Sequence, residues 1–313
     1  MKLVCLGLPL APLLLLKDGH TIDLVVLSPV AGPGRRRLVR GVGASRVRDA
    51  ESIGDVTRHL AEADLLVSWF WTRRIPASWL DLAKHGAIGA HPSLLPRHRG
   101  PNPYFWAIDM DDEVTGVTVH HLTPEYDRGG CLLQARVPIL GRDSWQLARA
   151  LDRPSLRLLR EAVRVIERGT ADPHPQDETH ATWAPEPSGD LLRVDWHWPT
   201  ERVLRRIRAL APVPGLALSM ADERFFVTRA RPAEPHPAAL LPGEAGITRT
   251  APRQVVIHTG DGAIAIERAT CVLPESNDEV AMDGAQLATR LAARLETTYP
   301  SPVLAPEHDP SES

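Results

Sequence analysis

The chain contains very little lysine and cysteine. Only Lys2, Lys17 and Lys84 are lysines among its 36 basic residues, and the formal net charge at pH 7 is −3. This balance argues against an extended nucleic-acid surface, which needs clustered positive charge. The three cysteines lie far apart without CxxC spacing, which indicates neither a disulfide framework nor a zinc site. Reduced thiols are typical of a cytoplasmic protein, and we expect that location.

Long apolar runs are also missing. No run reaches the roughly 18 residues that span a bilayer, so the sequence predicts no membrane segment. The apolar residues 8–16 could be read as part of a signal peptide, but they include Pro9 and Pro12, and only Lys2 precedes them. We therefore interpret the start of the chain as a buried strand that leads into a helix. A length of 313 residues allows one large domain or two small ones.

Short apolar runs alternate with a helical pattern in the first part of the chain. Strands are predicted where these runs occur, and a helix is predicted over residues 53–63. Alternation of this kind predicts an α/β fold, a Rossmann-like parallel sheet covered by helices. Ligands of such sheets bind at the carboxyl ends of the strands, which directs attention to the loops after Trp71, Ala90 and Leu122. The predicted strands are residues 1–7, 22–27, 64–71, 86–90 and 114–122.

The second part of the chain has a different pattern. A helix is predicted over residues 145–168, with a kink or a break into two helices at Pro154. Residues 171–187 read as a linker rich in Pro, His, Asp and Thr. A short strand from Val194 and a basic amphipathic helix follow, then closely spaced strands that predict a small β-barrel-like domain, and a last helix. The expected strands are residues 216–219, 224–229, 254–258 and 263–268, and the last helix is 284–297. The expected domains are residues 1–185 and 186–300, with a disordered tail over 301–313.

One block of sequence carries the most information about function. Residues 85–131 contain HPSLLP, then RG, PYFWAI, TGVTVH and YDRGG in this order. This series resembles the folate-dependent formyltransferases, which include methionyl-tRNA formyltransferase, glycinamide ribonucleotide transformylase and the sugar N-formyltransferases. The resemblance covers about residues 1–230 and is strongest over 64–135. It implies transfer of a formyl group from 10-formyltetrahydrofolate to an amine, within one-carbon metabolism.

The resemblance also implies the catalytic residues. The family uses an Asn, a His two residues later and a distant Asp, and His91 and Asp127 occupy the last two positions. A His donates to the oxyanion or relays a proton, and a carboxylate orients the His or accepts a proton through water. Gly89 stands where the family has Asn, and its lack of a side chain removes one oxyanion donor. Loss of such a donor typically lowers the rate by about 10²–10³.

Gly89 leaves three interpretations open. A water, Asn102 or a displaced His replaces the missing donor, and the chain remains a formyltransferase. Alternatively, the folate site is kept and supports altered one-carbon chemistry. In the third interpretation the chain is a non-catalytic relative that binds a folate or a partner.

The same resemblance implies a folate pocket with two walls. Arg73, Arg74 and Ile75 correspond to the segment that holds the pterin through backbone groups and an apolar side chain. The second wall is the loop that leads to Asp127, and its expected residues are His121, Leu122, Thr123, Glu125 and Tyr126. His120 and His121 point to opposite faces of a strand, so at most one of them faces the pocket.

Two other clusters have alternative interpretations. His91, His121 and Asp127 could form a metal site, but the resembled family needs no metal, and we predict none. Arg97 and Arg99 flank the loop after His91, where they either bind an acidic group of the acceptor, such as a phosphate, or belong to a solvated loop.

The charge of the C-terminal part bears on the acceptor. Residues 201–313 contain 12 Arg, no Lys and 15 acidic residues. A domain that grips tRNA should be basic, so we expect no tRNA and favour a small or carrier-tethered amine in specialised biosynthesis. Methionyl-tRNA is the second choice within the family. We expect no membrane partner, and nothing in the sequence excludes a homodimer.

Overall fold

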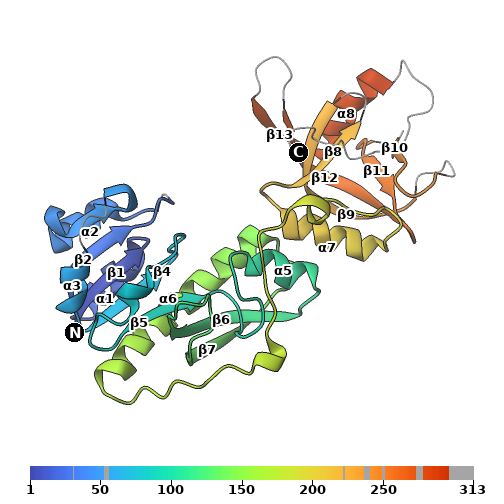
Figure 1. The fold of residues 1–313 in the computed structure, drawn as a ribbon. Helices are drawn as coiled ribbons and strands as arrows, with labels where there is room; N and C mark the ends of the chain where they lie inside the picture. The colour runs from blue at the N-terminus through green and yellow to red at the C-terminus, as the bar shows by residue number, and fades with distance from the viewer. Residues whose placement is uncertain are drawn as a thin grey trace. The chain divides into compact units, whose positions relative to one another are not determined.

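The computed structural model describes residues 1–30, 32–52, 56–220, 223–235, 240–248, 251–272 and 278–295. The chain divides into two compact units, which are described separately (Figure 1). The first unit consists of Met1–Pro103, Val114–Pro138 and Ala148–Pro185. The second consists of Tyr104–Glu113, Ile139–Leu147 and the chain from Glu186 onward. The expected tail over residues 301–313 and residues 53–55 of an expected helix lie outside the described residues.

The first unit is built on a seven-stranded sheet with the order β3-β2-β1-β4-β5-β6-β7. Strands β1 to β5 run parallel, and the Leu, Val and Ile side chains of β1, β2, β4 and β5 are almost fully buried, whereas the short strand β3 is half-buried. Burial on both faces explains why these four strands read as continuous apolar runs. The strands are β1 Lys2–Gly7, β2 Thr21–Leu27, β3 Val47–Asp49, β4 Leu65–Trp69, β5 Ala87–His91, β6 Val114–His121 and β7 Cys131–Pro138.

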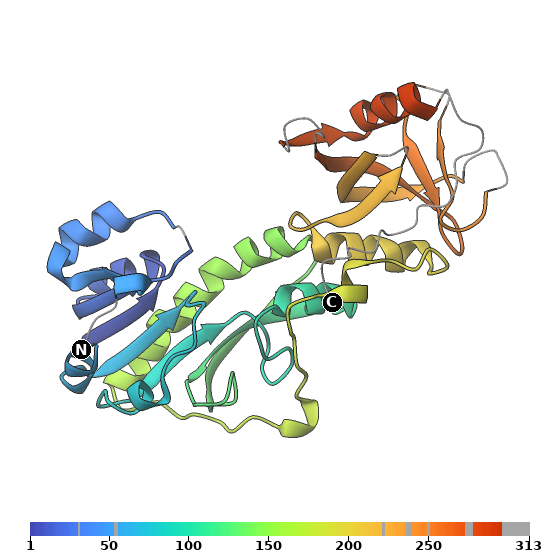
Figure 2. The same ribbon diagram turned by 45° about the horizontal axis from the view of Figure 1, so that its top comes forward.

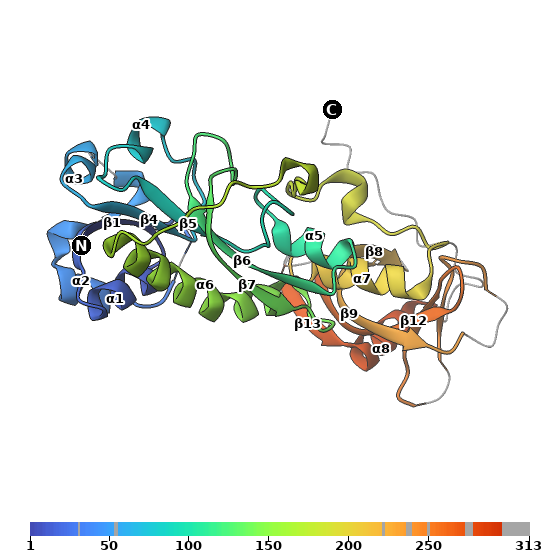
Figure 3. The same cartoon turned by 90° about the horizontal axis from the view of Figure 1, so that it is seen from below.

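Helices cover both faces of this sheet. Figure 3 shows α1, α2 and α6 on one face and α3 and α4 on the other. The predicted Rossmann-like α/β class is therefore confirmed. The helices are α1 Leu10–Lys17, α2 Arg35–Val42, α3 Thr57–Ala61, α4 Ala77–Leu80 and α6 Ser144–Glu167.

Pro154 does not divide helix α6. The helix runs for 24 residues with the proline inside it, where the sequence predicted a kink or two helices. Proline in a helix interior costs about 3 kcal/mol through a lost hydrogen bond and a steric clash. Leu151, Leu159 and Val163 are buried on both sides of the proline. Burial of each such side chain contributes about 1.5–3 kcal/mol, which offsets that cost.

Strand β6 runs opposite to its neighbour β5. His121 pairs with Ile88, and Thr118 pairs with His91, so the end of β6 lies beside the beginning of β5. The expectation that the loop after Leu122 starts at the carboxyl edge of a parallel sheet was therefore wrong. Antiparallel pairing instead places residues of β5 and β6 side by side on one face.

The expected linker is an ordered strap, which we define as residues 171–185. Its backbone pairs with Cys131 through His174 and with Arg99 through Trp183. The N–H of Asn102 donates to the carbonyl of Ala184, 3.0 Å away. The strap therefore crosses both the loop after β5 and the start of β7. Its few apolar residues explain why the sequence pattern did not show this role.

The second unit contains an antiparallel sheet with the order β10-β11-β12-β9-β8, and β13 pairs with β12. This confirms the small β-barrel-like second fold. Helix α7 packs on β9 and α8 packs on β12 (Figure 2). The short strand expected from Val194 is not formed. The elements are α5 Pro103–Asp109, α7 Thr200–Leu210, β8 Leu216–Met220, β9 Glu223–Ala233, β10 Ala245–Ile247, β11 Val255–His258, β12 Ala263–Val272, β13 Glu279–Asp283 and α8 Gly284–Leu295.

Candidate active site

A pocket of the first unit lies between the segment after β4 and the loop after β6. Its empty volume is about 530 Å³, open solvent included. Seven of the eight residues expected to bind folate line it, and His121 does not. These seven are Arg73, Arg74, Ile75, Leu122, Thr123, Glu125 and Tyr126. The lining also includes Ser68, Trp71, Leu80, Pro124 and Asp127.

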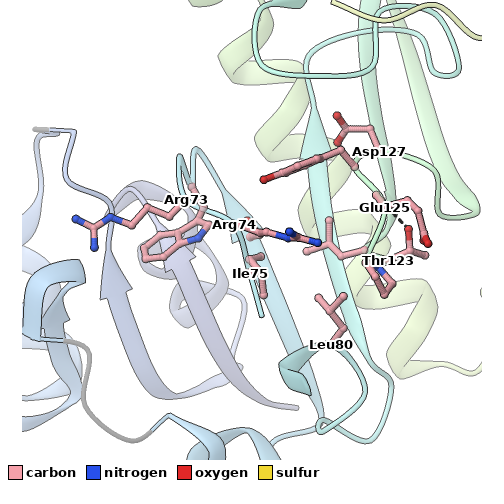
Figure 4. Close-up of a pocket in the computed structure, with 12 residues that line it drawn as sticks. Arg73, Arg74, Ile75, Leu80, Thr123, Glu125 and Asp127 are labelled. Atoms are coloured by element: carbon pink, nitrogen blue, oxygen red, sulfur yellow. Dashed lines mark hydrogen bonds between the residues drawn. The ribbon is translucent and has the colours of Figure 1, made fainter. Parts of the chain in front are cut away.

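The pocket has apolar side chains from both segments. Ile75 and Leu122 pack against the buried core, and this packing holds their side chains in place. The guanidinium of Arg73 donates to the carbonyl of Ala50 and to Glu51, whereas Arg74 extends toward the loop that contains Thr123 (Figure 4). Apolar walls with a polar loop backbone between them fit a flat heteroaromatic ring such as a pterin.

His91 is the last residue of β5, and its imidazole is buried. Its Nε2 donates to the carbonyl oxygen of His98, 2.8 Å away. On the other side of the ring, Nδ1 lies 3.5 Å from Oδ2 of Asp127. The same Oδ2 accepts a hydrogen bond from the N–H of Gly100 at 2.9 Å. Because Asp127 also lines the pocket, it joins the buried His91 to the expected folate site.

The backbone around this pair is unusual at three points. His98 and Asp127 have φ angles of 60° and 56°, in the left-handed region that non-glycine residues rarely adopt. A Cβ atom on Gly129 would lie 1.9 Å from the carbonyl oxygen of His121, so only glycine fits this bend. Strain of this kind is often found where a backbone positions functional groups.

His120 is a third member of the cluster, and the sequence did not single it out. It pairs directly with Gly89 across β5 and β6, so both positions face the same side of the sheet. Its Nδ1 donates to the carbonyl of His121 at 2.8 Å, and Nε2 lies 3.6 Å from Oδ1 of Asp127. Burial is the main cause that lowers the pKa of His120 to about 4. Strand alternation had limited the residues that face the pocket to at most one of His120 and His121. Neither lines the pocket, but His120 lies beside Asp127.

The metal alternative lacks structural support. It required His121 beside His91, but His121 lies on the other face of β6 from His120. Within the part of the chain that the structure describes, no cluster of three His, Cys, Asp or Glu residues is arranged to hold a metal ion.

The space beside Gly89 is occupied by Leu122. A Cβ atom on Gly89 would lie 2.9 Å from Cδ2 of Leu122, and the two next nearest atoms also belong to that side chain. Gly89 has ordinary strand geometry and a buried position. The glycine and the leucine therefore form a complementary pair where the family has an asparagine.

Arg99 has a structural role that neither sequence alternative described. It is buried, and its guanidinium donates to Oε1 of Gln176 and to both carboxylate oxygens of Glu178. The amide of Gln176 in turn donates to the carbonyls of Asp127 and Gly129 at 2.7 and 2.8 Å. The strap thus holds the loop that carries Asp127. The segment PQDETH gave no signal from hydrophobic pattern, so this network was missed.

The described part of the chain has no helix of sufficient length and apolar character to cross a membrane.

Comparison with known proteins agrees with this geometry. Residues 35–163 match the formyl transferase family, and residues 190–274 match the formyl transferase C-terminal domain. Methionyl-tRNA formyltransferase of Synechococcus sp. is 32% identical over 86% of this chain and 80% of its own length. The enzyme of the same name from Anaeromyxobacter dehalogenans is 33% identical over 84% of this chain and 89% of its own.

Two solved structures share the fold. HypX of Aquifex aeolicus in complex with tetrahydrofolic acid has a TM-score of 0.66 and 24% identity. The match covers 95% of this chain, which spans about half, 48%, of the HypX chain. An N-formyltransferase of Helicobacter canadensis, in complex with folinic acid and dTDP-3-aminofucose, has a TM-score of 0.63 and 15% identity over 85% and 99% of the two chains.

These findings bear on the expectations from sequence. The formyltransferase resemblance is confirmed. The two solved structures hold tetrahydrofolic acid and folinic acid. The expectation that tRNA is not the acceptor gains no support, because the sequence relatives are named methionyl-tRNA formyltransferases. The chain belongs to the folate-dependent formyltransferase family.

Proposed function

We propose that this chain transfers the formyl group of 10-formyltetrahydrofolate to a primary amine, with His91 and Asp127 as its catalytic residues. The observation that carries the proposal is the position of Asp127. Asp127 lines the pocket of the expected pterin-binding residues, and its carboxylate faces Nδ1 of His91 at 3.5 Å. The pocket and the proton-transferring pair are therefore one site, which favours catalysis over binding alone.

The proposed roles of the residues are binding of the pterin and transfer of a proton. Ile75 and Leu122 hold the pterin between apolar surfaces, and backbone groups of residues 73–75 and 121–126 bind its polar edge. The co-substrate supplies the formyl carbon. The acceptor amine must be neutral to attack, and Asp127 accepts its proton. His91, whose Nδ1 faces this carboxylate, relays the proton. We assign this chemistry to residues 1–185 and a supporting role to residues 186–300.

For the acceptor we propose a small or carrier-tethered amine of a biosynthetic pathway. The observation behind this choice is the balance of 12 arginines and 15 acidic residues in 201–313, without a lysine. Recognition of a tRNA backbone needs clustered positive charge, because each neutralised phosphate adds to affinity. Two of these arginines are also neutralised within the fold, because Arg202 and Arg206 both form ion pairs with Asp109.

Methionyl-tRNA is the second candidate, and the names and identities of the sequence relatives favour it. A comparison of turnover with each acceptor distinguishes the two proposals. The purified protein is incubated with 10-formyltetrahydrofolate and either charged methionyl-tRNA or a panel of amino sugars and aminoacyl carriers. Turnover with small amines and none with methionyl-tRNA supports the first proposal. Turnover with methionyl-tRNA that falls steeply with salt supports the second.

The proposal that this chain catalyses formyl transfer has its own test. His91→Ala and Asp127→Ala are compared with wild type at saturating co-substrate. We expect both variants to fold and to lose most activity. Turnover close to wild type in either variant would contradict the assigned roles.

A further inference from the structure

Two imidazoles flank Asp127, and each carries its proton on the side away from the carboxylate. Nε2 of His91 and Nδ1 of His120 each lie 2.8 Å from a backbone carbonyl oxygen. A carbonyl oxygen only accepts, so these nitrogens are the protonated ones. In the neutral rings, lone pairs on Nδ1 of His91 and Nε2 of His120 therefore face Asp127.

These contacts are too long for hydrogen bonds. The two nitrogens lie 3.5 and 3.6 Å from different oxygens of Asp127, beyond the usual range of about 2.7–3.2 Å. Three proton acceptors thus converge with no proton between them. An added proton converts one of these contacts into a charge-assisted hydrogen bond, so the three groups can hold a proton as a unit.

His120 is well placed to be a permanent member of this trio. It is 1% exposed, and the absence of a side chain at Gly89 makes it the polar side chain at this cross-strand position. The titratable groups around it are Asp127 and His91, the adjacent His121, and its strand partner Cys131. Burial keeps the pKa of His120 low, and this keeps a lone pair on Nε2 at neutral pH.

We propose that His120 is a positioning residue for formyl transfer, holding its Nε2 lone pair against Asp127 so that His91, Asp127 and His120 together take up the proton of the attacking amine. This inference rests on the proposed function. As the bond from the acceptor nitrogen to the formyl carbon forms, that nitrogen loses a proton to the trio. When the bond from the formyl carbon to the leaving nitrogen breaks, the trio returns the proton to the leaving nitrogen.

The variant His120→Gln tests this role. Glutamine keeps a polar side chain beside Asp127 but presents an N–H and cannot take up a proton. A donor in this position stabilises the carboxylate and weakens proton uptake. We expect kcat to fall at least tenfold, within the range of about 10²–10⁴ for acid–base groups, while KM for the co-substrate stays within twofold. We expect the acid limb of the kcat profile to move to lower pH. The exposed His85 provides the control His85→Gln, which should match wild type.

Two kinetic results would overturn the proposal. One is a kcat of His120→Gln close to wild type. The other is a lower kcat with an unmoved acid limb, because a loss of packing alone would reduce the rate without shifting the pH dependence of kcat.

A second measurement needs neither activity nor a variant. Nitrogen-15 NMR of the ligand-free wild type should show His120 protonated on Nδ1 and His91 protonated on Nε2 at neutral pH. Acidification should then change both rings together. Protonation of His120 on Nε2 at neutral pH would contradict the arrangement, whether or not the chain proves to be a formyltransferase.

Discussion

The packing of Leu122 against Gly89 leads to a prediction that a double-mutant cycle can test. In Gly89→Ala the new methyl group would lie 2.9 Å from Cδ2 of Leu122, whereas ordinary carbon contacts are about 3.5–4.0 Å. The leucine must therefore retreat by roughly 0.6–1 Å. Its terminal methyl group is flexible, so we expect a cost of about 1 kcal/mol, at the low end of overpacking effects.

The second half of the cycle introduces Gly89→Ala into a protein that lacks the Leu122 side chain. In Leu122→Ala the three atoms nearest the new methyl group are absent. Gly89→Ala should then stabilise the strand by about 0.5–1 kcal/mol, because alanine loses less backbone entropy than glycine. The difference between the two backgrounds, about 1.5–2 kcal/mol, is the expected coupling energy.

Hydrogen exchange measured by mass spectrometry is a suitable assay, because peptides over β5 and β6 report the first unit alone. The four proteins of the cycle are compared at equal pH and temperature. An equal cost of Gly89→Ala in both backgrounds would refute the conclusion that Leu122 fills the family's asparagine position.

Three further predictions follow from the site. His91→Ala and Asp127→Ala should each remain folded and lower kcat by about 10²–10⁴, and a smaller loss in a stopped assay would contradict their roles. Arg99→Lys should lower kcat more than it raises KM, because lysine lacks the fork that binds Gln176 and Glu178 together; equal kcat would contradict this. Arg99 and Arg128 lower the pKa of Glu178 from 4.5 to about 2, so this contact stabilises the strap above pH 4.5 and is lost as pH falls toward 2. Opening of the strap, measured by hydrogen exchange and corrected for the intrinsic effect of pH, should therefore increase as pH falls from 4.5 toward 2. Opening that does not change with pH would contradict the role of this ion pair.

The sequence predicted the fold where apolar pattern and chain order determine it. Strands β1, β2, β4 and β5 are parallel and buried, and each was visible as an apolar run. The direction of β6 was not predictable, because the same alternation of Val114–His121 suits parallel and antiparallel pairing. Helix α6 continued through Pro154 because burial on both sides outweighs a local penalty that the sequence shows by itself.

The candidate site was predicted only in part, because a motif locates residues along the chain but does not show which strands bring them together. A resemblance locates residues such as His91 and Asp127 by their place in a motif. It does not show cross-strand register, which alone makes His120 a neighbour of Gly89. Gln176 was missed because its hydrogen bonds reach the backbone of a distant loop, and contacts between distant segments leave no local pattern.

The central claim is that the pocket beside Asp127 binds a formyl-folate. Calorimetric titration with the stable analogue 5-formyltetrahydrofolate tests it most directly, with Ile75→Asp as a variant that places a charge on the apolar wall. The account predicts micromolar binding by wild type and none by the variant. Absence of binding by a folded wild-type protein would contradict it, as would equal binding by both proteins.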